Sequence, residues 1–276
     1  LIAVDWDRNV SIDVLAFGDS SGGVLTNILH GQLRWEPFPE ESNVSFGNSA
    51  VALVDADSNF SWDLLTVTGT TQTDNSGQFT WLGTSNADAG VTRFTKDSVF
   101  KGQMANDFAV GDFDNDGFVD AAAWNSALDK KQIAFYRGGP NAAFEEIFVM
   151  DLEVKSPIHA CETVDIDSDG DIDLILACEN SVEVLINEGG NANNWIDIPI
   201  RAEDAKQAQK PNERVNIHGV GSLLELRSGA AYQPQVVTGR STHFGLGKQT
   251  QVDSARVLWT NGIPEHIVNP KHGQPI

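Results

Sequence analysis

Short apolar runs separated by turn residues recur along the first two thirds of the chain. Val51–Val54 and Leu64–Val67 flank one polar stretch, and Ile172–Ala177 follows another. Apolar runs of roughly four to six residues between turn residues are typical of β-strands, whereas amphipathic helices need longer stretches with a 3.6-residue period. The sequence lacks such helical stretches, so the pattern predicts an all-β protein.

An acidic segment of nine residues recurs between these runs, at 5–13, 55–63, 112–120 and 165–173. Each copy has Asp at positions 1, 3 and 9 and Asp or Asn at position 5. Because strands flank each copy, we expect every acidic segment to be the loop of a β-hairpin. A repeat of about fifty residues has room for four short strands, which is one blade of a β-propeller. Asp and Asn also favour plain turns, but four copies in phase favour a shared role.

The acidic segments have the chemistry of a site for a hard cation. Carboxylates around one centre suit Ca²⁺, which takes 6–8 oxygen ligands at about 2.3–2.6 Å, better than Mg²⁺, which keeps its waters. Zinc is disfavoured because the segments contain no His or Cys. The net charge of -21 agrees with a cationic ligand. It excludes a nucleic-acid binder that works through bulk electrostatics, because phosphates would be repelled.

The four segments differ at positions 5 and 6. The third and fourth have Asp followed by Gly117 or Gly170, and the first two have Asn followed by Val10 or Phe60. Gly adopts the positive φ of a sharp turn and bulky residues resist it. We therefore expect calcium in the third and fourth segments and weak or no binding in the first two. The stronger candidate site residues are Asp112, Asp114, Asp116, Phe118, Asp120, Asp165, Asp167, Asp169, Asp171 and Asp173. The weaker candidates are Asp5, Asp7, Asn9, Asp13, Asp55, Asp57, Asn59 and Asp63.

The two cysteines, Cys161 and Cys178, bracket the fourth segment. In a hairpin closed around Asp169 they would face each other almost directly, and opposed strand positions lie about 4.5–5.5 Å apart, within disulfide range. A disulfide and a pair of buried thiols are both compatible with the sequence. A disulfide and a demand for calcium would both favour an oxidising compartment. We therefore expect an extracellular, cell-surface or periplasmic protein.

Residues 1–194 resemble the FG-GAP and VCBS families of integrin-like, calcium-binding propeller blades. Phe46-Gly47-Asn48-Ser49-Ala50 is similar to their Phe-Gly signature, and Val182–Gly190 is similar to the strand and turn that follow their loops. The resemblance implies a β-propeller with calcium in the hairpin loops. Such rings usually have about seven blades, and four are visible. Either the four blades form a ring by themselves or, as we expect, they belong to a larger ring with further blades before Leu1.

Residues 195–276 lack the acidic segment and alternate apolar with polar residues, as a sheet does. They contain Asn216–Gly221, His243-Phe244-Gly245-Leu246-Gly247 and Trp259-Thr260-Asn261-Gly262. Together these segments resemble the ASPIC/UnbV family, a β module commonly found after VCBS repeats in secreted proteins. The resemblance implies a C-terminal β-sandwich-like domain and carries no catalytic residues. His218 and His243 could flank a small site, but a histidine beside glycines in a turn is more often structural.

These features predict a non-enzymatic, calcium-binding interaction or adhesion protein whose partner is a protein or a glycan. Trp35 and Trp81 are candidate platforms for such a partner. One alternative is a structural subunit of an extracellular filament, surface layer or larger complex, with homotypic assembly. Another is a calcium-dependent propeller enzyme, although we find no convergent acid–base residues in the sequence. A run of about 18 apolar residues is missing, so we expect no membrane span.

Overall fold

A computed structural model describes residues 1–18, 22–29, 31–38, 50–68, 78–85, 93–100, 105–125, 131–154, 156–202, 216–273 and 276. These residues form strands, turns and two short 3₁₀ segments, Pro140–Ala142 and Gly190–Ala192, and no α-helix. The predicted all-β class is confirmed. Within the part of the chain that the structure describes, no helix is long and apolar enough to cross a membrane.

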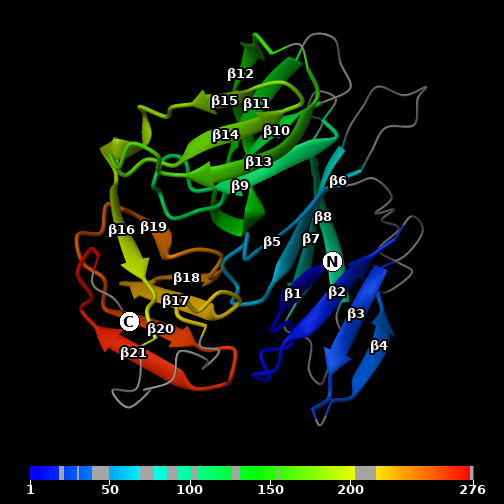
Figure 1. The fold of residues 1–276 in the computed structure, drawn as a ribbon, viewed down its shortest axis with the longest axis vertical. Coiled ribbons are helices and arrows are strands. Elements are labelled where there is room, and N and C mark those ends of the chain that lie inside the picture. The colour runs from blue at the N-terminus through cyan, green and yellow to red at the C-terminus, as the bar shows by residue number, and fades with distance from the viewer. Residues whose placement is uncertain are drawn as a thin grey trace.

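Three antiparallel meanders of four strands each form the N-terminal part of the protein (Figure 1). The first contains β1 (Ile2–Val4), β2 (Asp13–Phe17), β3 (Gly22–Asn27) and β4 (Leu33–Pro37). The second contains β5 (Val51–Val54), β6 (Asp63–Thr68), β7 (Gln78–Ser85) and β8 (Arg93–Phe100). The third contains β9 (Asp107–Gly111), β10 (Asp120–Trp124), β11 (Lys131–Arg137) and β12 (Glu145–Leu152). In each sheet the strands pair in chain order.

In the described part of the chain, the fourth meander has three strands rather than four. It contains β13 (Ile158–Val164), β14 (Asp173–Cys178) and β15 (Val182–Leu185). The four-strand repeat that the sequence predicts is therefore present three times and shortened once. Closure of these sheets into a ring, and the number of blades in it, stay predictions.

The acidic segments connect the first and second strands of each meander, so the predicted hairpins are confirmed. The register is the same in all four hairpins, because the Asp at position 9 pairs with the last residue before the loop. The pairs are Val4↔Asp13, Val54↔Asp63, Gly111↔Asp120 and Val164↔Asp173. Each loop consequently starts and ends at a fixed point of its sheet.

Neighbouring meanders pack face to face through strands that are apolar on both sides. Leu64 and Leu65 are adjacent in β6 and fully buried. Leu64 packs with the first sheet and Leu65 with the third, because successive side chains of a strand point to opposite faces. Ala122 and Trp124 of β10 pack with the fourth sheet in the same way. Full burial of one leucine side chain contributes about 1.5–3 kcal/mol, so these central strands hold the stack together.

The C-terminal part is built from two further sheets. Strand β16 (Asn194–Pro199) pairs with β19 (Ser241–Gly247). The other sheet has the order β18-β17-β20-β21, with bounds Ala231–Val236, Leu223–Ser228, Ser254–Leu258 and Pro264–Val268. Ile198 and Phe244 of the smaller sheet and Leu224 and Val257 of the larger one share a core and are fully buried. This arrangement agrees with a sandwich-like module.

The predicted opposition of the two cysteines is wrong. Cys161 pairs with Leu176, because the hairpin closes with Val164 opposite Asp173. Cys178 pairs with Ile158, beyond a register shift between Ile158 and Ala160. Both thiols are free and partly buried. They pack at the margin of the core between the third and fourth sheets, so the second alternative, two buried thiols, describes the structure better than a disulfide.

Candidate metal centres

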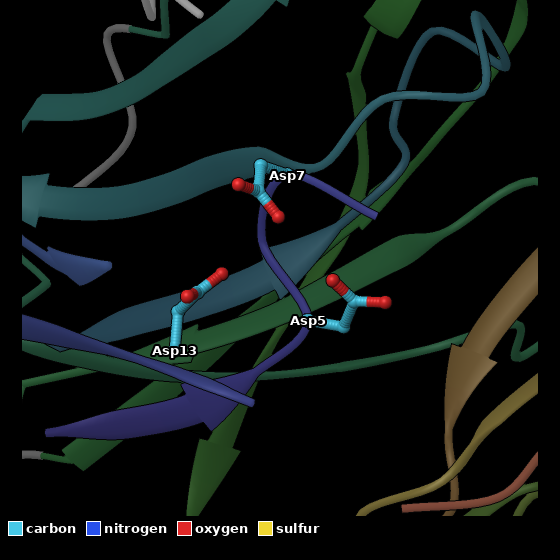
Figure 2. A group of neighbouring side chains, drawn as sticks. All are labelled: Asp5, Asp7 and Asp13. Carbon is cyan, nitrogen blue, oxygen red and sulfur yellow. The ribbon is translucent and has the colours of Figure 1, made fainter. Parts of the chain in front are cut away.

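The four acidic segments, called loops 1 to 4 here in chain order, each gather three carboxylates. In every loop the Asp residues at positions 1, 3 and 9 place one oxygen each within 4.8 Å of the others, a group that could hold a metal ion. Figure 2 shows the group in loop 1, where the carboxylates of Asp5, Asp7 and Asp13 converge on one space. The corresponding groups are Asp55, Asp57 and Asp63, then Asp112, Asp114 and Asp120, then Asp165, Asp167 and Asp173.

Backbone N–H groups hold these carboxylates in the same way in all four loops. The Asp at position 1 accepts from the N–H at position 6, over distances of 2.8–3.1 Å. The Asp at position 9 accepts from the N–H at position 2, over 2.8–2.9 Å. The loop backbone therefore wraps around the carboxylates at positions 1 and 9, and these hydrogen bonds orient both carboxylates before any ion binds.

The residue at position 6 has a positive φ in all four loops, although it is not glycine in loops 1 and 2. Val10 has φ 78° and Phe60 has φ 70°, in the same region as Gly117 at 94° and Gly170 at 98°. The left-handed conformation costs a non-glycine residue about 1–2 kcal/mol, which the N–H bonds to Asp5 and Asp55 help to offset. Val10 and Phe60 therefore adopt the turn at a conformational cost that Gly117 and Gly170 do not carry. The predicted order of affinities stays a prediction.

Positions 5 and 7 have roles other than those of the three-carboxylate group. The side-chain oxygen of Asn9, Asn59, Asp116 or Asp169 accepts from the N–H two residues later. Among the candidate residues, Phe118 supplies that N–H in loop 3. The carboxylate of Asp171 is fully buried and accepts from the N–H of Gly190 at 2.7 Å. Position 5 therefore shapes the turn, and Asp171 fastens loop 4 to the segment after β15.

Burial and crowding of like charges raise the pKa values of several of these acids. Burial, reinforced by the charge of Asp63, raises the pKa of Asp55 to about 7. Burial and the neighbouring acids also raise the pKa of Asp120 to about 7 and that of Asp5 to about 6. The pKa of Asp112 lies well above its ordinary value, because of burial and then the charge of Asp120. A bound cation would reverse this penalty on ionisation.

Two unpaired oxygens indicate that the groups fit a cation. Asp5 Oδ1 and Asp165 Oδ1 are buried and have no hydrogen-bond partner. A buried acceptor without a donor is costly, and a metal ion would satisfy both oxygens. In loop 3, Arg137 Nε lies 2.7 Å from Asp114 Oδ2 and offsets part of the charge. With only oxygen donors in the groups, the arrangement is compatible with calcium.

Asn115, at position 4 of loop 3, is a residue that the sequence reasoning missed. It is fully buried, with φ 57°. Its Nδ2 donates to the carbonyl of Gly170 at 2.8 Å, and its Oδ1 lies 2.6 Å from Nε2 of His243. Its backbone carbonyl accepts from the N–H of Gly247 at 2.7 Å. Asn115 therefore joins loop 3, loop 4 and strand β19, which an amide can do because it both donates and accepts.

The His243–Gly247 segment of β19 lies directly on loop 3. A Cβ atom on Gly245 would stand 1.9 Å from Asp112 Oδ2, so no side chain fits there. His243 stacks on Trp195 at 5.5 Å between ring centroids, and its Nδ1 lies 3.5 Å from Asp197 Oδ1. His243 is therefore an interface residue, and His218 lies in the turn before β17.

The other loops also reach the C-terminal part of the chain. In loop 1, Arg8 donates to the hydroxyl of Tyr232 at 3.3 Å and lies 3.8 Å from the buried carboxylate of Glu225. In loop 2, the ring of Phe60 packs on Tyr232 at 4.5 Å. In loop 4, a Cβ on Gly170 would collide with Trp195. The C-terminal module thus contacts the tips of all four loops, mainly through positions 4 and 6.

The sequence also predicts two platforms for a partner, Trp35 and Trp81, and a Phe-Gly signature at Phe46–Ala50. Trp35 lies on β4 and is 47% exposed, so it is accessible to a partner. Trp81 lies in β7, but its side chain is outside the description. The Phe46–Ser49 part of the Phe-Gly signature also lies outside the described residues.

The comparison with known families supports the C-terminal resemblance. Residues 212–276 match the family model described as ASPIC and UnbV. A search of curated proteins found no match to the chain. The match covers the segment with β17 to β21, whereas β16, which completes the smaller sheet, precedes it. The resemblance of residues 1–194 to FG-GAP and VCBS repeats stays a prediction.

Proposed function

We propose that this protein is a calcium-binding, extracytoplasmic interaction protein whose four meanders are blades of a β-propeller. The observation that carries the proposal is the set of four carboxylate groups in one register beneath one C-terminal module. Calcium would bind the Asp residues at positions 1, 3 and 9 of each loop. The ion would supply the charge that the buried acids lack, and the backbone bonds would keep those acids aimed at it.

Calcium in this position would act on the interface with the C-terminal module. Asp112 binds the ion and its Oδ2 also borders Gly245 of β19. An occupied loop 3 would keep Asn115 in place for His243. The ions would then hold meanders and module as one rigid surface, which lowers the entropy cost of binding a partner. Extracellular calcium modules typically work at Kd values of about 10⁻⁴–10⁻³ M, so an affinity in that range is what the proposed extracytoplasmic location predicts.

The propeller part of the proposal rests on the stacking of the sheets. Strands β6 and β10 bury both faces, each between two neighbouring sheets. Face-to-face sheets whose strands pair in chain order are the building plan of propeller blades. Further blades would be needed to close a ring of the usual size. The partner would be a protein or a glycan, and catalysis forms no part of the proposal.

A calcium titration of the whole chain tests the proposal. We expect a saturable heat of calcium binding in calorimetry. We also expect calcium to raise the Tm and EGTA to reverse that rise, because an ion that binds only the folded state stabilises it. Asp112→Asn should abolish one binding event. Glu265→Gln removes an exposed acid on β21 and is the matched control. A Tm that neither calcium nor EGTA changes would overturn the calcium part.

A further inference from the structure

Among the residues that the structure describes, the fourth meander has no counterpart of the outer strand of the other three. Strands β3, β7 and β11 are each paired on both sides, by β2 and β4, β6 and β8, and β10 and β12. Strand β15 holds the same third place, yet among the described residues it pairs with β14 alone. Strand β15 and strand β12 of the third sheet line the same groove, and their labels lie next to each other in Figure 1. The internal repeat thus defines a place for one more strand, next to β15.

Side chains at this place are exposed where their equivalents are buried. Strand β3 is mostly buried, and so is β11, but β15 alternates between exposed and half-buried residues. Val182 is 64% exposed, Val184 42% and Ile186 45%. Across from them on β12, Ile147 and Phe148 are 46% and 49% exposed. The third and fourth sheets therefore present apolar side chains that no described strand covers.

A groove runs between these two sheets. Its volume is ≈ 550 Å³, and its lining includes Phe135, Phe148 and Met150 on one wall and Val184, Leu185 and Ile186 on the other. Phe135 and Phe148 stack at 4.5 Å, so this wall is a flat apolar surface. The groove has the volume of several large side chains and lies beside the edge of β15.

We propose that the edge of β15 binds an extended segment of a partner protein, which becomes the fourth strand of this sheet. The inference rests on the interaction role proposed above and deepens it by naming the chemistry of the partner; calcium is not part of it. A free strand edge offers N–H and C=O groups that pair with an added strand. Alternate apolar side chains of that strand would fill the groove.

The hydrogen-bond pattern indicates which edge groups are available. Cys178 N donates to the carbonyl of Ser181, so Cys178 and Ser181 form a hydrogen-bonded pair of the antiparallel ladder. Hydrogen-bonded and non-hydrogen-bonded pairs alternate. The N–H groups of Val182 and Val184 therefore point away from β14, toward the place of the added strand.

Charge selects a different protein rather than a second copy of this chain. Each copy carries a net charge of -21, so two copies repel each other. Glu183 on β15 and Glu188 at the groove add negative charge at this edge. A partner strand with Lys or Arg between its apolar residues would complement these acids. The proposed occupant is therefore a basic, alternating, extended segment.

The test uses a fluorescein-labelled octapeptide with the sequence of β12, in which Lys replaces its three acids: Lys-Lys-Ile-Phe-Val-Met-Lys-Leu. It is titrated into the whole chain in calcium, followed by anisotropy and by hydrogen exchange of residues 182–186. We expect saturable binding and slower exchange there. Val184→Pro removes an outward N–H and should weaken binding at least tenfold. Ile186→Asp, which leaves the backbone intact, should do the same.

Ile263→Asp places the same charge on an exposed apolar residue of the C-terminal module and should leave the affinity unchanged. Lack of binding by the calcium-loaded, folded protein would overturn the inference. Binding that survives both β15 variants would also overturn it. If sedimentation showed dimers of this protein that dissociate when the peptide binds, the edge of β15 would be assigned to a second copy instead. A protein that binds the peptide but ignores calcium would refute the calcium part of the proposed function and leave this inference standing.

Discussion

Loop 1 and loop 3 have the same backbone but different neighbours. In both, the Asp at position 1 accepts from the N–H at position 6 and the Asp at position 9 from the N–H at position 2. Loop 1 meets the C-terminal module through Arg8 and Tyr232, and loop 3 through Asn115 and His243. The acids therefore set the loop geometry, while positions 4 and 6 vary with the surface that each loop touches. The residue type at position 6 therefore reflects the surface that the loop contacts more directly than it reflects metal binding.

We expect pH to have the largest effect on stability, and this effect depends on the loop carboxylates rather than on the contacts with the C-terminal module. Asp5, Asp55 and Asp120 have raised pKa values in the folded protein, at about 6 to 7. Between about pH 4 and pH 7 the folded state therefore binds more protons than the unfolded state, whose Asp pKa is about 3.9. Without calcium, the free energy of unfolding should fall as pH rises through this window. Urea melts in EGTA at pH 4.5 and 7.5 check this.

Calcium should reverse that trend, because it binds the ionised acids and competes with protons. In saturating calcium the protein should be more stable at pH 7.5 than at pH 4.5. Stability that rises with pH in EGTA as well would show that the pKa values of these buried acids are not raised in the folded protein.

The next effect concerns position 9 in the two loops. Asp120→Asn and Asp13→Asn each alter a buried carboxylate that accepts two backbone N–H bonds. Each should remove one calcium ion from the stoichiometry measured by calorimetry. Unfolding in calcium should become easier by about 2–4 kcal/mol, because charge-assisted hydrogen bonds weaken together with the metal site. If only Asp120→Asn removes an ion, loop 1 is a structural turn and the predicted ranking of the loops is correct.

Asn115→Ala separates the neighbour contact from the metal group. It leaves His243 and the carbonyl of Gly170 without their buried partner, so we expect a loss of about 2–4 kcal/mol in the free energy of unfolding. Ser58→Ala alters the equivalent, exposed position of loop 2 and should change stability by less than about 0.5 kcal/mol. Chemical denaturation in saturating calcium measures both. Equal effects of the two variants would mean that Asn115 does not anchor the module.

The smallest effect tests position 6. Gly117→Ala places a Cβ at φ 94°, 3.3 Å from Gln233 Nε2, and should destabilise the protein by about 1–2 kcal/mol. Val10→Gly removes the strain at φ 78° but also the contact with Gly262, so we expect a change within about 1 kcal/mol. Thermal melts of both variants compare them. If Val10→Gly lowered the stability by more than about 1 kcal/mol, packing against Gly262 rather than the φ of the turn would explain why valine is found here.

The sequence predicted what depends on local pattern. The period of the acidic segments located four hairpins, and the alternation after residue 194 indicated the strands of the C-terminal part. It failed where distant segments meet: 128 residues separate Asn115 from His243, and no local pattern links them. The cysteines show a related limit: the hairpin closes with Val164 opposite Asp173, which places Cys161 opposite Leu176, two residues short of Cys178. Residue spacing alone did not show which residues pair at the ends of the loop.

The path of β16 has a consequence for cutting the protein into pieces. The strand leaves the fourth meander and at once becomes half of a two-stranded sheet with β19. A fragment that starts at residue 212, where the family match begins, would lose Ile196 and Ile198 from its core. Phe244, fully buried in the whole chain, would lose its backbone partner Ile196 and face solvent along an open edge. A soluble C-terminal fragment must therefore begin before Asn194, so the unit of folding is longer than the unit of sequence similarity.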